Sequence, residues 1–176
     1  MTRYPGVVTG IVKNLDDPRG EGRIEVHFPW LSEDNRSGWA PVAVPLAGRA
    51  RGQWFMPEID DEVLVAFEHG DFEHPFIVGF LWNGEDVPPE TTNKNRIIKT
   101  PGGHQLRFED EDGQQKIIVK TNGGHQITLD DSASAQSIKV QTNQGQSLTL
   151  DDKTQSIELK GGGRTLKMIG GAVQIA

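Results

Sequence analysis

Cysteine is absent from this chain of 176 residues, which excludes a disulfide framework, a thiolate metal site and a cysteine nucleophile. No run reaches the length of about 18 apolar residues that a membrane-spanning helix needs. Residues 1–10 lack the basic start and apolar run of a signal peptide, so we expect the chain to be cytoplasmic when it assembles. A basic excess is also absent: the net charge of −7 argues against general nucleic-acid binding.

The second half of the chain has almost no aromatic residues or proline. All 4 Trp, the single Tyr and every Phe except Phe108 precede Asn83, and all prolines except Pro101 lie at or before Pro89. Charge divides in the same way, because residues 1–96 carry the whole excess of acidic groups whereas residues 97–176 are neutral. Residues 83–95 are polar, contain Pro88 and show no periodicity, which is typical of a connection between domains.

The first half contains short β-branched and apolar runs separated by turn residues. The clearest is residues 23–28, whose alternation places Ile24, Val26 and Phe28 on one face of a strand. Pro41 and Pro45 suit an edge strand or a distorted strand. About five strands with no helical period predict a small closed barrel of the OB type. The expected strand segments are residues 7–12, 23–28, 39–44, 53–56, 62–68 and 76–82.

The second half is a repeat with a period of about 21 residues. Residues 100–110, 121–131 and 142–152 align with one another, and residues 161–168 form a shortened fourth copy. A second strand lies between successive copies, and further strand-like segments lie at Ile97-Ile98 and at residues 173–175. Each repeat strand has apolar residues at positions i and i+2, which predicts stacked β-strands with one thin apolar face.

That apolar face predicts a homotrimer. Two inward side chains per strand contribute on the order of 2 kcal/mol each, whereas ordering the surrounding backbone costs roughly 1–2 kcal/mol per residue. Three chains around a threefold axis bury the face and pair the strand edges; a single-chain solenoid is the alternative. The expected trimer core consists of Leu106, Phe108, Ile117, Val119, Ile127, Leu129, Ile138, Val140, Leu148, Leu150, Ile157, Leu159, Leu166 and Met168.

Residues Gly10–Trp30, Pro57–Asp71 and His74–Gly84 resemble, in order, the OB domain of contractile-tail spike proteins. This family comprises phage baseplate assembly protein V and the VgrG-type spikes of type VI secretion and extracellular contractile injection systems. The resemblance implies an all-β chain with an OB-fold barrel at 1–90, a linker at 91–96 and a trimeric β-helix or β-prism needle at 97–176. It also implies a structural spike that punctures a target envelope mechanically.

The resemblance further implies the partners of the chain. We expect a separate hub protein at the OB end, because VgrG-type spikes begin with a hub region and this sequence starts at the OB domain. We expect a PAAR-type tip protein to contact Val173, Ile175 and Ala176, and the target membrane or envelope to be contacted only transiently. The linker has no room for the hydrolase that some phage spikes insert, and the sequence has no His-x-His pair of the kind that holds a metal at some spike tips.

Candidate catalytic and metal-binding residues have structural interpretations that we favour. His69 and His74 lie among acidic residues in a short loop that suits a solvated turn as well as a metal. His104 and His125 occupy equivalent turn positions where later copies have Gln146 and Arg164, which suits a tolerant position. The acidic doublets at 109–110, 130–131 and 151–152 suit turn caps better than a calcium-binding β-roll.

No enzymatic activity, cofactor or metal is therefore expected, and two other functions are alternatives. The first is an OB-fold nucleic-acid-binding protein, for which Trp30, Trp39 and Trp54 are the candidate stacking residues. The negative charge of the half that contains them opposes nucleic acid as a partner. The second is the shaft of a trimeric tail fibre or adhesin.

Overall fold

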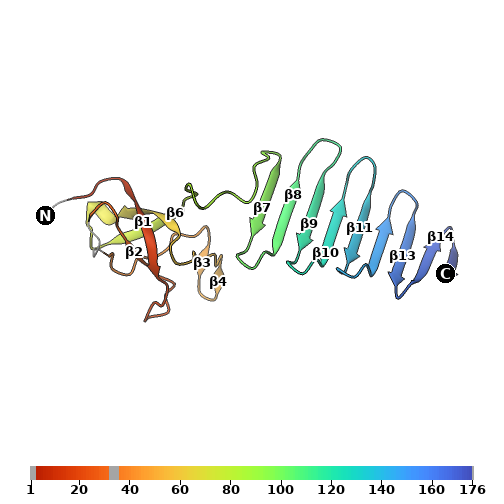
Figure 1. Ribbon diagram of the computed structural model, residues 1–176, viewed down its shortest axis with the longest axis horizontal. Helices are drawn as coiled ribbons and strands as arrows, with labels where there is room; N and C mark the ends of the chain where they lie inside the picture. The colour runs from red at the N-terminus through yellow and green to blue at the C-terminus, as the bar shows by residue number, and fades with distance from the viewer. Residues whose placement is uncertain (1–2, 32–35, 176) are drawn as a thin grey trace. The chain divides into compact units, whose positions relative to one another are not determined.

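The computed structural model describes residues 3–31 and 36–175. The chain divides into two compact units, one up to Val87 and the other from Pro88 onwards, and each is described here by itself. The first unit contains strands β1 to β6 and the second contains β7 to β15 (Figure 1). Among the described residues, no helix is long and apolar enough to cross a membrane.

The first unit is built on a four-stranded antiparallel sheet in the order β2-β1-β5-β6. Backbone hydrogen bonds join Ile24, just before β2, to Ala40, and join Ile77 in β6 to Pro41 and Ala43. The segment around Ala40 therefore bridges the two edges of the sheet and closes it into the predicted small barrel. The elements are β1 (Val7–Asn14), β2 (Glu25–His27), β3 (Ala47–Gly48), β4 (Arg51–Gly52), β5 (Glu62–Phe67), the 3₁₀ turn η1 (Glu68–Gly70) and β6 (Pro75–Phe80).

The hydrophobic core lies inside this barrel. Ile24, Val26 and Phe28 are all fully buried, which confirms the alternation predicted for this segment. Val63 and Val65 of β5 are buried with them, because alternate residues of a strand point to the same face. The complete core cluster is Val12, Ile24, Val26, Phe28, Ala40, Val63, Val65, Phe67 and Ile77.

Two of the expected strand segments are not regular strands. Residues 39–44 form only isolated bridges, from Ala40 to Ile24 and from Val42 to Ile77. Pro41 and Pro45 interrupt this segment, and each lacks the N–H that a continuous ladder requires. Residues 53–56 form no strand either; the short hairpin of β3 and β4 precedes them instead. The strand prediction at 53–56 was therefore wrong.

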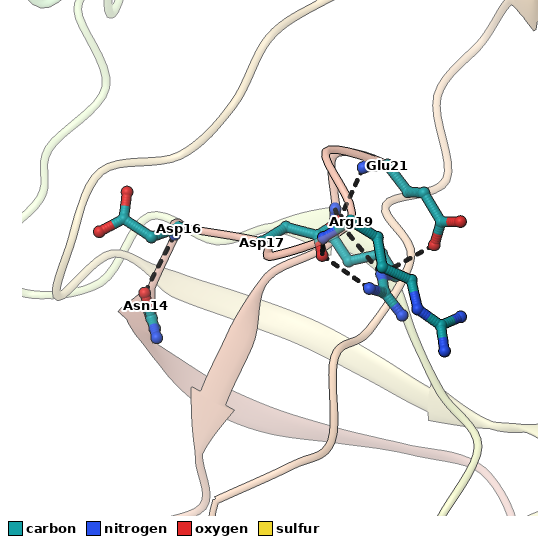
Figure 2. Close-up of polar contacts among 6 residues, drawn as sticks. Asn14, Asp16, Asp17, Arg19 and Glu21 are labelled. Atoms are coloured by element: carbon teal, nitrogen blue, oxygen red, sulfur yellow. Dashed lines mark hydrogen bonds and ion pairs between the residues drawn. The ribbon is translucent and has the colours of Figure 1, made fainter.

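The loop between β1 and β2 is organised by the carboxylate of Asp17. It accepts hydrogen bonds from the backbone N–H groups of Arg19, Glu21 and Arg23 (Figure 2). The Arg23 guanidinium adds Nη2–Oδ1 and Nε–Oδ2 contacts of 2.6 and 3.1 Å. These bonds, chiefly those from the Arg23 side chain, hold the pKa of Asp17 far below its usual range. The hydrogen bonds of this loop therefore converge on one charged residue, while Leu15 at its start packs against the barrel core.

The second unit is a single nine-stranded antiparallel sheet in which every strand pairs with its sequence neighbours. Figure 1 shows this run from β7 to β15 as a continuous meander. The strands are β7 (Asn95–Lys99), β8 (Gln105–Glu109), β9 (Lys116–Lys120), β10 (Gln126–Asp130), β11 (Ser137–Gln141), β12 (Ser147–Asp151), β13 (Ser156–Gly161), β14 (Arg164–Ile169) and β15 (Ala172–Ile175).

The turns of this sheet follow the sequence repeat and then shorten. Strands β8, β10 and β12 begin at Gln105, Gln126 and Ser147, which confirms the period of about 21. Along one side of the sheet the connections shorten from residues 110–115 and 131–136 to 152–155 and finally 170–171. On the other side they shorten from residues 100–104 to 162–163. The turns are therefore shorter toward β15, whereas the strands are not: β13 and β14 have 6 residues each, and only β15, with 4, is shorter than the strands before it.

Candidate trimerisation surface

The apolar residues of the second unit lie in two rows on one face of the sheet. Antiparallel register places Ile127 opposite both Val119 and Val140, and the same alignment continues on both sides. Because directly opposed residues in a sheet point to the same face, the partners form continuous rows. The first row is Ile98, Leu106, Val119, Ile127, Val140, Leu148, Leu159, Leu166 and Ile175. The second row is Phe108, Ile117, Leu129, Ile138, Leu150, Ile157, Met168 and Val173.

All 14 residues expected in the needle core belong to these two rows. They remain accessible in a single chain: Ile138 is 45% exposed and Leu159 is 47% exposed, although both lie in the middle of the sheet. Val173 and Ile175, the expected tip contacts, extend the rows on β15 and are 62% and 77% exposed. Ala176 lies outside the described residues. One chain therefore presents an apolar sheet face that nothing within its own described residues covers.

The opposite face of the same sheet is largely polar from β10 onwards, although Ile97 of β7 and Ile118 of β9 also lie on it. Its central row passes through Thr128, Lys139, Thr149, Glu158 and Lys167, which are directly opposed across successive strands. The Nζ atom of Lys160 lies 2.7 Å from Oε2 of Glu158 and is the main cause of the lowered pKa of that carboxyl. The contrast between the faces assigns one to water and the other to burial.

Polar residues border the apolar rows along both sides of the sheet. Along one side, the backbone N–H of Thr121 donates to the carbonyl of His125, and Thr142 donates in the same way to Gln146. These pairs continue the alternation of the first row by two residues, so their side chains belong to the apolar face. We call this border the His/Thr margin; its members are Thr100, His104, Thr121, His125, Thr142 and Gln146.

The other border is acidic. The backbone N–H of Asp131 donates to the carbonyl of Gln115, and Asp152 donates to Gln136, which continues the second row by two residues. We call this border the Asp/Gln margin; its members are Asp110, Gln115, Asp131, Gln136 and Asp152. A hollow of about 440 Å³ on this side is lined by the margin together with residues of the second row.

In the acidic doublets at 130–131 and 151–152, the first carboxylate accepts a hydrogen bond within a turn, whereas the second belongs to the Asp/Gln margin. Asp130 accepts a hydrogen bond from the Ser132 N–H at 3.0 Å, and Asp151 accepts one from the Thr154 N–H at 2.8 Å. These bonds confirm turn capping for the doublets at 130–131 and 151–152. In the doublet at 109–110, Glu109 and Asp110 form ion pairs with Arg107 and Arg96 instead. The Thr154 N–H is the largest cause of the lowered pKa of Asp151. At Asp130, burial acts to raise the pKa, but the bonds from Ser132 and the Lys116 ammonium lower it overall.

The segment leading into β7 is anchored to the polar face by Glu90. Its carboxylate accepts from the N–H groups of Thr91 and Thr92 and from the Asn95 amide, and it lies 2.8 Å from Nη2 of Arg107. These partners, led by the Thr92 N–H, lower the pKa of Glu90 to about 2. Sequence reasoning missed this contact, because Glu90 belongs to an aperiodic segment and Arg107 is one of many polar residues that alternate with the apolar ones.

The other candidate residues belong to the first unit and are not part of this surface. His74 Nδ1 lies 3.2 Å from Oδ2 of Asp71 in the loop after η1. Among the residues the structure describes, no group of three or more His, Asp or Glu side chains is arranged to hold a metal ion. Trp30 packs against Tyr4 and Phe28. Trp54 is 74% exposed, and Trp39 is half-buried.

Both units match known protein families. Residues 8–82 match the type VI secretion system/phage-baseplate injector OB domain. Residues 116–176 match the phage baseplate V C-terminal trimerisation domain. The two matches therefore coincide with the barrel and with the part of the sheet from β9 to β15.

Several curated proteins are similar over more than half of this chain. The type VI secretion system spike protein VgrG5 of Pseudomonas aeruginosa is 40% identical in an alignment of length 135 that covers 65% of this chain and 17% of the relative. VgrG3 of Vibrio cholerae is 30% identical over 64% of this chain and 13% of its own length. VgrG1a of P. aeruginosa is 33% identical over 57% of this chain and 19% of its own length. This chain thus spans less than about a fifth of these relatives, and it belongs to the family of phage-baseplate V and VgrG-type spike proteins.

Proposed function

We propose that this chain is the central spike of a contractile injection machine, in which three copies form a needle that punctures a target envelope. The observation that carries the proposal is the pair of apolar rows, accessible in one chain and located in a sheet that matches a trimerisation domain. Around a threefold axis, the three apolar faces meet and exclude water from one another. The polar faces then form the outside of the needle.

The sheet geometry suits a mechanical role. Nine strands spaced about 4.8 Å apart give a shaft of roughly 40 Å, and the turns that border the sheet become shorter toward β15. The apolar face and its hydrogen-bonding borders are suited to holding chains together, and this role does not require a catalytic pocket. We therefore propose a structural function without catalysis. The chain is made and assembled in the cytoplasm and becomes part of a phage virion or injection particle.

The two domains have separate tasks in this proposal. The barrel of residues 1–90 attaches to a hub protein, and residues 91–96 connect it to the needle of residues 97–176. Val7, Phe76 and Val78 support the hub contact, because these apolar side chains are exposed on the barrel. Exposed Val173 and Ile175 support contact with a PAAR-type tip protein at the β15 end of the sheet. The target envelope is then contacted only during puncture.

The mass of the chain in solution tests this function directly. Three chains of 19.4 kDa give a particle of about 58 kDa, which multi-angle light scattering or native mass spectrometry distinguishes from a monomer. A purified full chain that stays at 19.4 kDa over the micromolar range contradicts the needle. Mixing the trimer with its candidate hub and tip proteins then tests each partner separately.

A further inference from the structure

The two margins of the apolar face carry complementary hydrogen-bonding groups. On the His/Thr margin, the His125 ring has no side-chain partner among the residues that the structure describes. On the Asp/Gln margin, the carboxylates of Asp131 and Asp152 also lack a side-chain partner within the described part of the chain. His125 and Asp131 cannot reach each other within one chain, because they lie at opposite ends of β10, about 20 Å apart.

Rotational symmetry brings these margins together between chains. When the apolar faces of identical sheets meet around an axis that runs along the strand stack, each His/Thr margin lies beside the Asp/Gln margin of the next copy. When the three chains are not shifted relative to one another along the axis, the end of each strand lies beside the end of the same strand in the next chain. On β10, His125 then faces Asp131 of the partner subunit, and on β12 Gln146 faces Asp152 of the partner subunit. On β9 and β11, Thr121 and Thr142 face Gln115 and Gln136 of the partner subunit.

We propose that these margins form three polar seams in the trimer, in which His125 of each chain binds the Asp131 carboxylate of the next chain at the same height. The proposal rests on the trimeric needle proposed above and assigns its lateral contacts. Each seam pair joins groups that can donate and accept hydrogen bonds, and a histidine that carries a proton strengthens the bond to a carboxylate.

The seams supply a register that the apolar rows lack. Every strand from β8 to β14 offers two apolar side chains, so a trimer that loses its threefold symmetry because one chain slips by one strand along the axis still buries similar apolar surface. Such a slip brings His125 opposite Gln115 or Gln136 of the partner subunit and removes its contact with a carboxylate. Polar pairs at the border of an apolar interface thus select one alignment among several of similar burial.

A paired cysteine substitution tests the seam, because the natural chain has no cysteine that could form competing cross-links. After reaction with a short bis-maleimide, which spans the larger Cβ–Cβ separation of a hydrogen-bonded His–Asp pair, the double variant His125→Cys/Asp131→Cys should run as a covalent trimer of about 58 kDa on a denaturing gel. Each single variant should remain a 19.4 kDa chain on the same gel. The matched control is His125→Cys/Gln146→Cys, whose substitutions share one margin about 9.5 Å apart, so that a cross-link between them stays within one chain.

The possible results of this experiment test the seam and the proposed needle separately. A covalent trimer that exceeds the control by about tenfold or more supports the seam. A wild-type trimer without cross-linking of the pair overturns the seam and leaves the needle intact, whereas a wild-type monomer overturns both. Cross-linking of His125→Cys with Asp152→Cys, but not with Asp131→Cys, overturns the equal-height register.

A charge exchange provides a second, independent measurement. Asp131→Lys places a cation against His125 of the neighbouring chain in all three seams and should weaken each by about tenfold, so that the trimer dissociation constant rises roughly a thousandfold. Adding His125→Glu to the Asp131→Lys variant places a carboxylate opposite the new lysine of the neighbouring chain. This double variant should recover most of the affinity of the chains for one another. Failure of the second substitution to recover trimerisation contradicts a direct contact between the two positions.

Discussion

Glycine recurs at the same place in three successive turns of the His/Thr margin, where the backbone turns back on itself. Gly103, Gly124 and Gly145 have φ angles of 82°, 88° and 86°, in the left-handed region that only glycine enters without strain. In the same turns the Thr121 hydroxyl accepts the N–H of His125 at 3.1 Å, and Thr142 does the same for Gln146 at 3.2 Å. These repeated bonds fix the positions of His125 and Gln146 on the His/Thr margin.

Replacing Gly124 by alanine should therefore lower the free energy of unfolding by about 1–2 kcal/mol. The new Cβ must also approach the Asn143 Cβ to 3.1 Å. Gly123→Ala is the matched control: Gly123 is not among the residues with positive φ, and its added Cβ meets neighbours only at 3.9–4.0 Å. Chemical denaturation of both variants measures the difference; equal effects at the two positions would contradict the assigned turn geometry.

Glu90 makes the stability of the second unit depend on acid pH. Its pKa is about 2 in the folded chain, against an ordinary value of 4.5, so its contribution is complete above pH 4.5 and is lost as the pH falls toward 2. The thermal midpoint should fall over this range in the wild type and less steeply in Glu90→Gln. Glu111→Gln, which changes an exposed glutamate in the 110–115 turn, should keep the wild-type slope. Thermal midpoints that fall equally steeply with pH in Glu90→Gln and in the wild type would contradict this prediction.

At the scale of the strand, period-two alternation is the signal that sequence reasoning uses best. It correctly placed Ile24, Val26 and Phe28 in the barrel core and brought residues such as Leu148 and Leu150 onto one face of β12. Prediction failed where long-range hydrogen bonding decides the structure. The bridges of Ala40 to Ile24 and of Val42 to Ile77 depend on the closed barrel, and a sequence window does not contain their partners.

Contacts formed by isolated polar residues were the least predictable part of the surface. Asp17 and Arg23, and likewise Glu90 and Arg107, have no periodicity that marks them as partners before the fold is known. The repeat did align His104 with His125, but their place beside the apolar rows became visible only from the backbone pairing of Thr121 with His125. A turn position that accepts many residue types and a position beside the apolar rows cannot be distinguished in a single sequence.

Leu148 and Thr149 are neighbours on β12 that face opposite ways, and they provide a direct test of the two faces. Leu148→Asp should abolish trimerisation, because it places three carboxylates in the shared apolar core, where burial of unpaired charge is prohibitive. Thr149→Asp introduces the same charge on the polar face, opposite Lys139 and Glu158, and should keep the trimer. Light scattering distinguishes the two; retention of a trimer by Leu148→Asp shows that the inward face is wrongly assigned.

At the scale of the whole molecule, the two units obtain their stability from different sources. The barrel has its own cluster of fully buried residues, including Val12, Phe28 and Ile77. The sheet from β7 to β15 has no fully buried apolar side chain among its described residues and depends on other copies for burial. Folding of the barrel is thus a property of one chain, whereas folding of the sheet is coupled to association.

This difference predicts how the two halves behave when they are separated. Residues 1–87 should unfold cooperatively as a monomer, with a midpoint that does not change with protein concentration. Residues 88–176 should be trimeric, with a midpoint that rises with concentration, because mass action links their stability to assembly. A concentration-dependent barrel fragment, or a second fragment that is stable as a monomer, would reverse the assignment. Calorimetry over about a 100-fold concentration range measures both.

The strict sequence order of the strands from β7 to β15 also governs how quickly the sheet can form. Every strand pairs only with the strand just before or just after it in the chain, so each closure spans one short turn and its entropic cost is small. Such a chain has a low contact order, which favours rapid folding by addition of one hairpin at a time. The slow step in producing the needle should therefore be the encounter of chains, with a rate that depends on their concentration.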